Sequence, residues 1–318
     1  MTTGECVANA MGNGLGSTLD ALEEKRQQMM NGNTKIMLWI FGFALLPMGW
    51  FLLHHTHWVA YAIVAFIAVL ICAVWINSRK KNLAIEFKQE AINHLLDAVL
   101  PSIRYSAMGY VHESEFNASN LYKQPDRYNG KDYFEGYADK TAVSFSLVHA
   151  EERYETTHTD TDKDGHTTTT TREHWRDIFK GLFFAADFNK NFQGRTLVRA
   201  GKAGILSGLF GNIVKLEDPR FNKLFHVSSS DQVEARYILT PSLMERLIGL
   251  RDSLSGFEVS FNGSWVYIAS SDFPWGAFEP DLRKPCNDTR QVERMLGWIL
   301  QVVGIVEELD LNTRIWTK

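Results

Sequence analysis

The stretch Asp160–Gly165 has the residue types and spacing of the first half of a calcium-binding loop. In such a loop, alternate carboxylates and a glycine turn enclose a hard cation. The second half departs from this pattern, because Thr171 stands where a glutamate would bind through both oxygens. Asp160, Asp162 and Asp164 are therefore weak metal candidates, and a solvated hairpin tip is the favoured interpretation.

The other residues that could do chemistry are scattered. His158, His166 and His174 recur at regular intervals, but no pair of them has the close spacing of zinc ligands. No Ser/His/Asp, Cys/His or paired-carboxylate arrangement can be assembled from the spacing. We therefore expect no metal and no organic cofactor, and the sequence leaves open whether the protein is an enzyme.

Three charged residues, Asp231, Glu234 and Arg236, stand before the strand-like segment 237–239. They could form a buried ion pair or belong to a site in a cleft. A buried ion pair is by itself no sign of function, and we favour the structural role.

The glycine-rich segment Gly201–Gly211 resembles a phosphate-binding loop only superficially, because it lacks the Gly-Lys-Ser/Thr ending. It contains four large apolar residues, Ile205, Leu206, Leu209 and Phe210. These side chains could insert into a membrane interface. A buried turn is the favoured alternative.

The loop from Phe273 to Phe278 is the strongest candidate for binding another protein. Phe273, Trp275 and Phe278 stand in a Pro/Gly context, and aromatic side chains supply large contact areas at low entropic cost. The alternative, given equal weight, is that the loop folds back and covers the core.

Two apolar runs without charge, Ile36–Leu53 and Trp58–Ile76, are separated only by a four-residue polar turn. Each is close to the roughly 20 residues that a membrane-spanning helix needs, and neither has a polar face. The sequence therefore predicts a two-helix transmembrane hairpin at residues 35–78, after a tail at residues 1–34 with a short helix near residues 17–25. Because basic residues flank both runs and none occurs in the turn, both termini are expected in the cytoplasm.

Charge and cysteine content restrict the remaining possibilities. The chain contains 33 basic and 37 acidic residues, and its net charge is −4. The mildly acidic part after the hairpin is a poor match for nucleic acid. The three cysteines suggest no disulfide framework, as in a reducing compartment.

Residues 79–318 are expected to form an α+β domain with antiparallel sheets, either as one domain or as two lobes at about 79–200 and 201–318. Apolar residues at helical spacing predict an amphipathic helix over 80–100, and others predict helices over 240–254 and 288–309. Alternation predicts a long hairpin from strands near 143–147 and 175–188, with the Thr-rich segment at its tip. Asn262-Gly263 predicts a second hairpin, with two positive φ values at its turn.

Four segments carry a resemblance to a known family: Ile178–Phe184, Asp187–Phe192, Val214–Phe221 and Asp231–Pro241. They resemble an uncharacterised bacterial family of two-span membrane proteins, the domain of unknown function 3137 family. The resemblance implies a location in the bacterial inner membrane, with several spans. It implies no established reaction and no catalytic residues.

These observations favour a membrane-anchored cytoplasmic interaction or scaffold module. Its expected partners are the lipid bilayer and another membrane or cytoplasmic protein. Two alternatives stay open. One is a membrane-bound enzyme, such as a hydrolase, with a site between the lobes near Asp231, Glu234 and Arg236. The other is a lipid-sensing module that uses Gly201–Gly211.

Overall fold

The structure is a computed structural model of the whole chain. It describes residues 3–54, 58–161, 167–188, 190–200 and 212–311, except for the side chains of residues 40–41, 43–54, 58–62, 64–65, 160–161 and 168. The chain divides into two compact units. We call them the helical unit (residues 1–99 and 278–296) and the sheet unit (residues 100–277 and 297–318).

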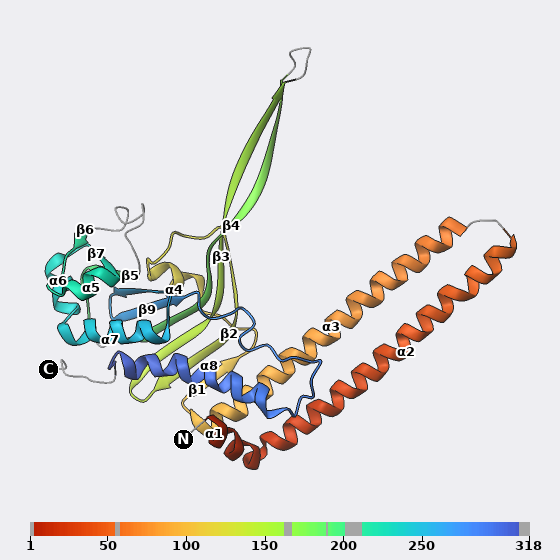
Figure 1. Cartoon of the computed structure of the whole chain (residues 1–318), viewed down its shortest axis with the longest axis horizontal. Coiled ribbons are helices and arrows are strands. Elements are labelled where there is room, and N and C mark those ends of the chain that lie inside the picture. The colour runs from red at the N-terminus through yellow and green to blue at the C-terminus, as the bar shows by residue number, and fades with distance from the viewer. Residues whose placement is uncertain (1–2, 55–57, 162–166, 189, 201–211, 312–318) are drawn as a thin grey trace. The chain divides into compact units, whose positions relative to one another are not determined.

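Two long helices dominate the helical unit (Figure 1). Its elements are α1 (Thr3–Ala10), the kinked segment η1 (Met11–Leu15), α2 (Gly16–His54), α3 (Trp58–Val99) and the first part of α8 (Thr289–Glu308). The predicted short helix and the first apolar run thus form one continuous helix. The second apolar run likewise continues into the predicted amphipathic helix as α3.

The buried stripe of α3 is the one that the sequence predicts. Leu83, Phe87, Leu95 and Leu96 are all buried, because residues three and four apart share one face of a helix. Lys88 is also buried, and its Nζ lies 3.1 Å from Glu279 Oε1. This pairing neutralises a charge that would be costly to bury alone.

Within the part of the chain that the structure describes, no helix is long and apolar enough to cross a membrane. Most side chains of the predicted spans Ile36–Leu53 and Trp58–Ile76 lie outside the described residues. The two-span hairpin therefore stays a prediction.

The sheet unit is built on one nine-stranded sheet in the order β1-β2-β3-β4-β9-β8-β5-β7-β6 (Figure 1). Its strands are β1 (Ile103–Ser106), β2 (Arg127–Ala138), β3 (Thr141–Thr161), β4 (Thr167–Asp187), β5 (Arg195–Ala200), β6 (Asn212–Val214), β7 (Phe225–Ser229), β8 (Phe257–Asn262) and β9 (Trp265–Ser270). All the pairs of neighbouring strands described here are antiparallel. The predicted α+β class with antiparallel strands is confirmed.

The sheet runs across the lobe boundary that was considered at residue 200. Strand β9 pairs with β4, and β8 pairs with β5, so strands from both predicted lobes are neighbours in one sheet. The described strands thus form one continuous sheet, whereas the sequence predicts more than one sheet.

The β8–β9 hairpin forms as predicted, but its turn lies one residue further along the chain. Asn262 pairs with Trp265, so Gly263 and Ser264 form the turn. Gly263 has φ +60, and Asn262 is not among the residues with positive φ. This geometry is typical of a type II′ turn, which needs glycine at its first central position, and the predicted pair of positive φ values is wrong.

Four helices complete the sheet unit with the end of α8: α4 (Glu113–Ala118), α5 (Pro219–Leu224), α6 (Gln232–Ile238) and α7 (Pro241–Ser253). Thr240 caps α7 by accepting a hydrogen bond from Leu243 N, as the Thr-Pro start predicts. The strand-like segment 237–239 instead ends helix α6. The prediction of a strand is wrong because Asp231 caps a helix that begins at Gln232 and continues into this segment.

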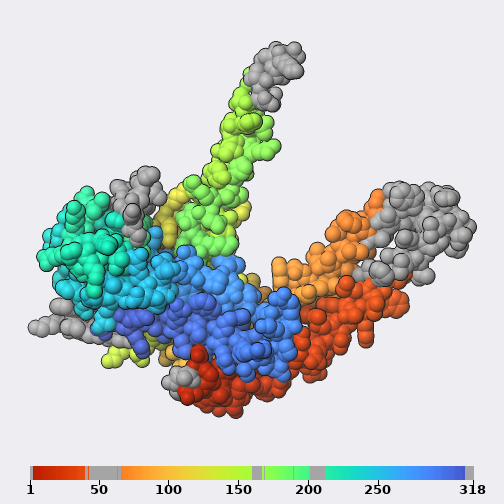
Figure 2. Space-filling model, viewed as in Figure 1, coloured from red at the N-terminus to blue at the C-terminus, as the bar shows by residue number. Residues whose placement is uncertain are grey.

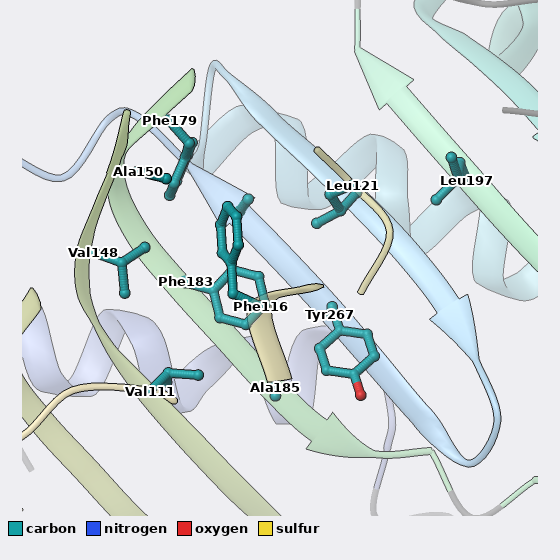
Figure 3. Close-up of a cluster of buried hydrophobic side chains, with 11 residues drawn as sticks. Val111, Phe116, Leu121, Val148, Ala150, Phe179, Phe183, Ala185, Leu197 and Tyr267 are labelled. Atoms are coloured by element: carbon teal, nitrogen blue, oxygen red, sulfur yellow. The ribbon is translucent and has the colours of Figure 1, made fainter. Parts of the chain in front are cut away.

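An aromatic cluster fills the core on one face of the sheet (Figure 3). Phe116 of α4 packs against Phe183 of β4 with ring centroids 5.3 Å apart, and Phe183 contacts Tyr267 of β9 at 6.0 Å. Aromatic pairs at such distances add to the stability gained from burial alone. The cluster fixes α4 on this face of the sheet.

Candidate interaction surface

Strands β3 and β4 continue far beyond the rest of the sheet as a two-stranded ribbon, which we call the arm (residues 152–161 and 167–176). Strand β2 pairs with β3 only as far as the Arg127–Glu151 pair, and β9 pairs with β4 only over Leu182–Asp187. Beyond these points β3 and β4 pair only with each other among the described residues. Figures 1 and 2 show the arm in green, projecting from the strands of its unit.

The composition of the arm suits an exposed ribbon. Threonine dominates its outer half, and β-branched side chains favour extended backbone. Thr157 pairs with Thr171, and Thr159 pairs with Thr169, so threonines face each other across the two strands. These side chains are exposed, and the arm buries almost no apolar surface of its own.

Polar contacts hold the lower part of the arm. Arg153 donates from its backbone N to Asp126 Oδ2 at 2.8 Å and from Nη1 to Glu173 Oε1 at 3.1 Å. Glu152, which is buried, accepts from Arg176 Nε at 2.6 Å and also pairs with Lys123. The predicted long hairpin is confirmed, because β3 and β4 pair with each other, and charged pairs fix its base. The sequence places the Thr-rich segment at the tip, whereas in the structure it forms paired strand up to Thr161 and from Thr167, so that part of the prediction is wrong.

Aromatic and basic side chains gather where the arm leaves the sheet. We call this group the basal patch: Arg127, Lys131, His149, Trp175, Lys180 and Trp275. The Arg127 guanidinium carbon lies 3.7 Å from the Trp175 ring centroid, and Trp175 is 38% exposed. Lys131 Nζ and Lys180 Nζ lie 5.2 Å and 5.5 Å from the Trp275 ring centroid, and His149 meets that ring edge-on.

Three side chains at the patch could ligate a metal ion: His149, Glu151 and Asp177 offer ligand atoms within 4.8 Å of one another. They are already engaged with other groups. His149 Nε2 lies 2.7 Å from Asp177 Oδ1, and Glu151 pairs with Arg127 at 3.5 Å. Because Arg127 and Lys180 place positive charge beside the group, we interpret it as an ion-pair network.

Two aromatic residues of the loop from Phe273 to Phe278, the predicted partner-binding loop, are buried. Phe273 is 2% exposed and Phe278 is 0% exposed, so the expectation of accessible rings is wrong for these two residues. Phe273 packs against Trp298 with ring centroids 5.0 Å apart. The loop therefore covers the core at these positions, which is the alternative of equal weight. Trp275 is partly exposed, and its role in partner binding stays a prediction.

Asp231, Glu234 and Arg236 serve the backbone around α6. Asp231 Oδ1 accepts from Val233 N and Glu234 N. Glu234 accepts from Gln193 N at 2.9 Å and from Gly194 N at 2.7 Å, and Arg236 donates to Gln232 O and Lys215 O. These hydrogen bonds give the three residues the structural role that the sequence favours.

Several predicted site residues lie outside the described part of the chain. These are Asp162 and Asp164 of the tip and the interface candidates Ile205, Leu206, Leu209 and Phe210. The backbone of Asp160 belongs to β3, but its side chain is not among those that the structure describes.

Sequence reasoning missed the basal patch. Its residues come from β2, β3, β4 and the loop after β9, and in the sequence His149 looks like an isolated histidine. The alternation of Arg127, Asn129 and Lys131 does indicate one polar strand face. Only the register of β2, β3 and β4 brings that face to Trp175 and His149.

The fold and this surface define an α+β protein with a projecting arm, and the family comparison agrees with the resemblance seen in the sequence. Residues 177–311, from β4 to the region after α8, match the family model described as Protein of unknown function (DUF3137). The resemblance to that family is confirmed over these residues. No curated protein sequence matches the chain.

A search of solved structures finds the crystal structure of the mycobacterial trehalose monomycolate transport factor A, TtfA. The sequence identity is 11%, the match covers 63% of this chain and 88% of that chain, and the TM-score is 0.32. A likeness this distant does not bear on function.

Proposed function

We propose that this protein is a membrane-anchored interaction module whose β3–β4 arm contacts another protein. One observation carries the proposal: both outer edges of the arm lack a neighbouring strand among the described residues. Unpaired N–H and C=O groups along an edge are a template for a further strand, and folded proteins ordinarily shorten or cover such edges. The proposed occupant is an extended segment of a partner protein, added as a strand.

The outer half of the arm and the basal patch offer a partner different kinds of contact. The threonine-rich outer half offers main-chain hydrogen bonds with little side-chain selectivity. The basal patch offers Trp175, Trp275 and Arg127, which are residue types that often dominate binding energy. An isolated two-stranded ribbon is only marginally stable in water, so added strand pairing would stabilise it.

The membrane anchor in this proposal is the α2–α3 hairpin. Large apolar side chains are exposed along α3, among them Ile63 (53%), Phe66 (63%), Ile71 (63%) and Val74 (70%). Contiguous exposed apolar surface of this kind marks contact with lipid or with protein. We propose the bacterial inner membrane as the location, with both termini in the cytoplasm and Arg79, Lys80 and Lys81 on the cytoplasmic side.

The two alternatives have less support. The hydrolase alternative needs a site near Asp231, Glu234 and Arg236, whose side chains are occupied by backbone hydrogen bonds. The lipid-sensing alternative depends on Gly201–Gly211, which lies outside the described residues.

The proposal is tested by photo-crosslinking in native membranes of cells that express the full chain. A crosslinking amino acid at Thr157 or Thr171 should capture a discrete protein. The same probe at Val233, which is 78% exposed on α6, is the matched control. Equal capture at all three positions, or none at the arm positions, would overturn the role of the arm.

The membrane part of the proposal has a separate test. Reporter fusions after Lys35 and after Lys318 should both report the cytoplasm, and a fusion at Thr56 should report the opposite side. An external signal at Lys318 would contradict the proposed topology.

A further inference from the structure

A cavity of about 680 Å³ opens on the face of the sheet unit that carries α4. Its wall is made by strands β1, β2, β3 and β9 together with Glu115 of α4. This volume is within the range of about 300–1,000 Å³ that is typical of small-molecule sites. No residue of the basal patch or of the arm lines it.

Strand register explains why polar groups gather here. Arg104 of β1 lies opposite Glu135 of β2, and Glu135 lies opposite Ser144 of β3. Beyond Ala185 of β4, the same row reaches Tyr267 of β9. Because residues opposite one another share a face, this row places a guanidinium, a carboxylate and two hydroxyls along one wall.

Glu115 completes the wall from above the sheet. Its Oε1 accepts a hydrogen bond from Ser144 Oγ at 3.1 Å, and the side chain is half-buried. Burial raises the pKa of Glu115, and burial together with the nearby Glu115 carboxylate raises the pKa of Tyr267 to about 12. Figure 3 shows Tyr267 at the margin of the aromatic cluster, with its hydroxyl directed away from Phe179.

The side chains at the opening keep hydrogen-bonding capacity for a ligand. The side chain of Arg104 is exposed, and its guanidinium has no ion-pair or hydrogen-bond partner among the described residues. Glu135 accepts from Tyr133 at 3.1 Å through one oxygen and is otherwise exposed. Trp265 and Tyr137 contribute aromatic surface to the same cavity.

This combination restricts the chemistry of the ligand. The two carboxylates disfavour an anion, and the unpaired guanidinium disfavours a cation. Polar groups line too much of the wall for a purely apolar molecule. A ligand with many hydroxyl groups fits these side chains. Its hydroxyls can donate hydrogen bonds to the carboxylates, its hydroxyl oxygens can accept from the guanidinium, and its C–H faces can pack against the aromatic rings.

We propose that the cavity binds a neutral polyhydroxylated small molecule, a mono- or disaccharide, with Glu115 and Glu135 accepting from its hydroxyls and Arg104 donating to them. Trp265 packs against a C–H face of the bound sugar. This site is independent of the arm and its partner.

The test is an equilibrium binding screen of the purified full chain against a panel of neutral mono- and disaccharides that includes glucose, maltose and sucrose. Inorganic phosphate and spermidine represent the anionic and cationic classes. At least one sugar should bind. Arg104→Ala, Glu135→Gln and Trp265→Ala should each weaken that binding by about tenfold, because each removes a direct contact.

Glu217→Gln is the matched control for Glu135→Gln, because Glu217 is exposed and does not line the cavity. Arg104 and Glu135 are exposed, so their variants should melt as the unsubstituted protein does. The proposal is overturned if no sugar in the panel binds, if only phosphate or spermidine binds, or if the control weakens sugar binding as much as the cavity variants.

Discussion

The Arg127 guanidinium carbon lies 3.7 Å from the centre of the Trp175 ring, so the first residue of β2 contacts a residue of β4 across the intervening strand β3. Arg127 also pairs with Glu151 at 3.5 Å. These contacts lie at the last pair of β2 with β3, beyond which the arm continues alone. Arg127 thus marks the point where the sheet ends and the arm begins.

Replacing Trp175 with Ala should separate binding from stability. A partly exposed cation–π contact contributes only about 0.5–1 kcal/mol, so the free energy of unfolding should fall by no more than that. Loss of an aromatic anchor should nevertheless reduce crosslinking of a partner from Thr157. Urea unfolding and crosslinking yield are the two measurements, with Val233→Ala as control, and unchanged crosslinking would exclude Trp175 as an anchor.

Removing residues 157–171 and joining Thr156 to Arg172 with a short glycine-containing turn should leave the fold intact. Thr156 and Arg172 pair across the arm, and the described residues between them are exposed. The free energy of unfolding should change by less than about 1 kcal/mol, because little surface is buried. Partner capture should be lost, whereas a large drop in melting temperature would show that the outer arm is part of the folded core.

Phe273 and Trp275 should respond differently to truncation, although they share one loop. Phe273→Ala empties a fully packed position and should cost about 3–5 kcal/mol in unfolding free energy. Trp275→Ala should cost less than about 2 kcal/mol, because the ring is partly exposed and its contacts are with two lysines and a histidine. Denaturant unfolding of both variants checks this order, and equal losses would show that Trp275 is a core residue too.

Glu23 should make stability depend on pH in the acid range. A side-chain hydrogen bond from Arg26, supported by the backbone N–H of Cys286, lowers the pKa of Glu23 from 4.5 to about 2. A carboxyl whose pKa is lower in the folded state stabilises the fold above its unfolded pKa. That contribution is lost as pH falls from about 4.5 to 2.

The Glu23→Gln variant is therefore expected to melt lower at pH 7 and to lose less stability than the unsubstituted protein over that acid range. Thermal melts between pH 2 and 7 measure the difference. Glu24→Gln, at an exposed neighbouring position, is the control, and parallel pH profiles for all three proteins would contradict the assigned hydrogen bonds.

Local patterns in the sequence are enough to predict several elements. Thr240-Pro241 determines where α7 begins, because the threonine caps the helix and proline suits its first turn. Apolar spacing over 288–309 predicts α8, and alternation on either side of the threonine run predicts the β3–β4 hairpin. Each of these signals comes from residues inside the element that it predicts or directly next to it in the chain.

A local signal was also available for the one helix that was mistaken for a strand. Asp231 followed three residues later by Glu234 is typical of a helix N-terminus. Asp231 caps α6 as that pattern implies. Glu234 instead reaches Gln193 and Gly194, a contact across the chain that no local pattern contains.

The sequence by itself thus determined the α+β class, the starts of α7 and α8 and the existence of the long hairpin, because capping, turn and periodicity signals act between near neighbours in the chain. Only the tertiary structure decided that β4 pairs with β9 and β5 with β8, that Phe273 is buried while Trp275 is partly exposed, and that Arg127 meets Trp175. The same register brings Arg104, Glu135 and Ser144 into one row at the cavity. Strand order and register depend on contacts between residues far apart in the chain, and no local pattern specifies them.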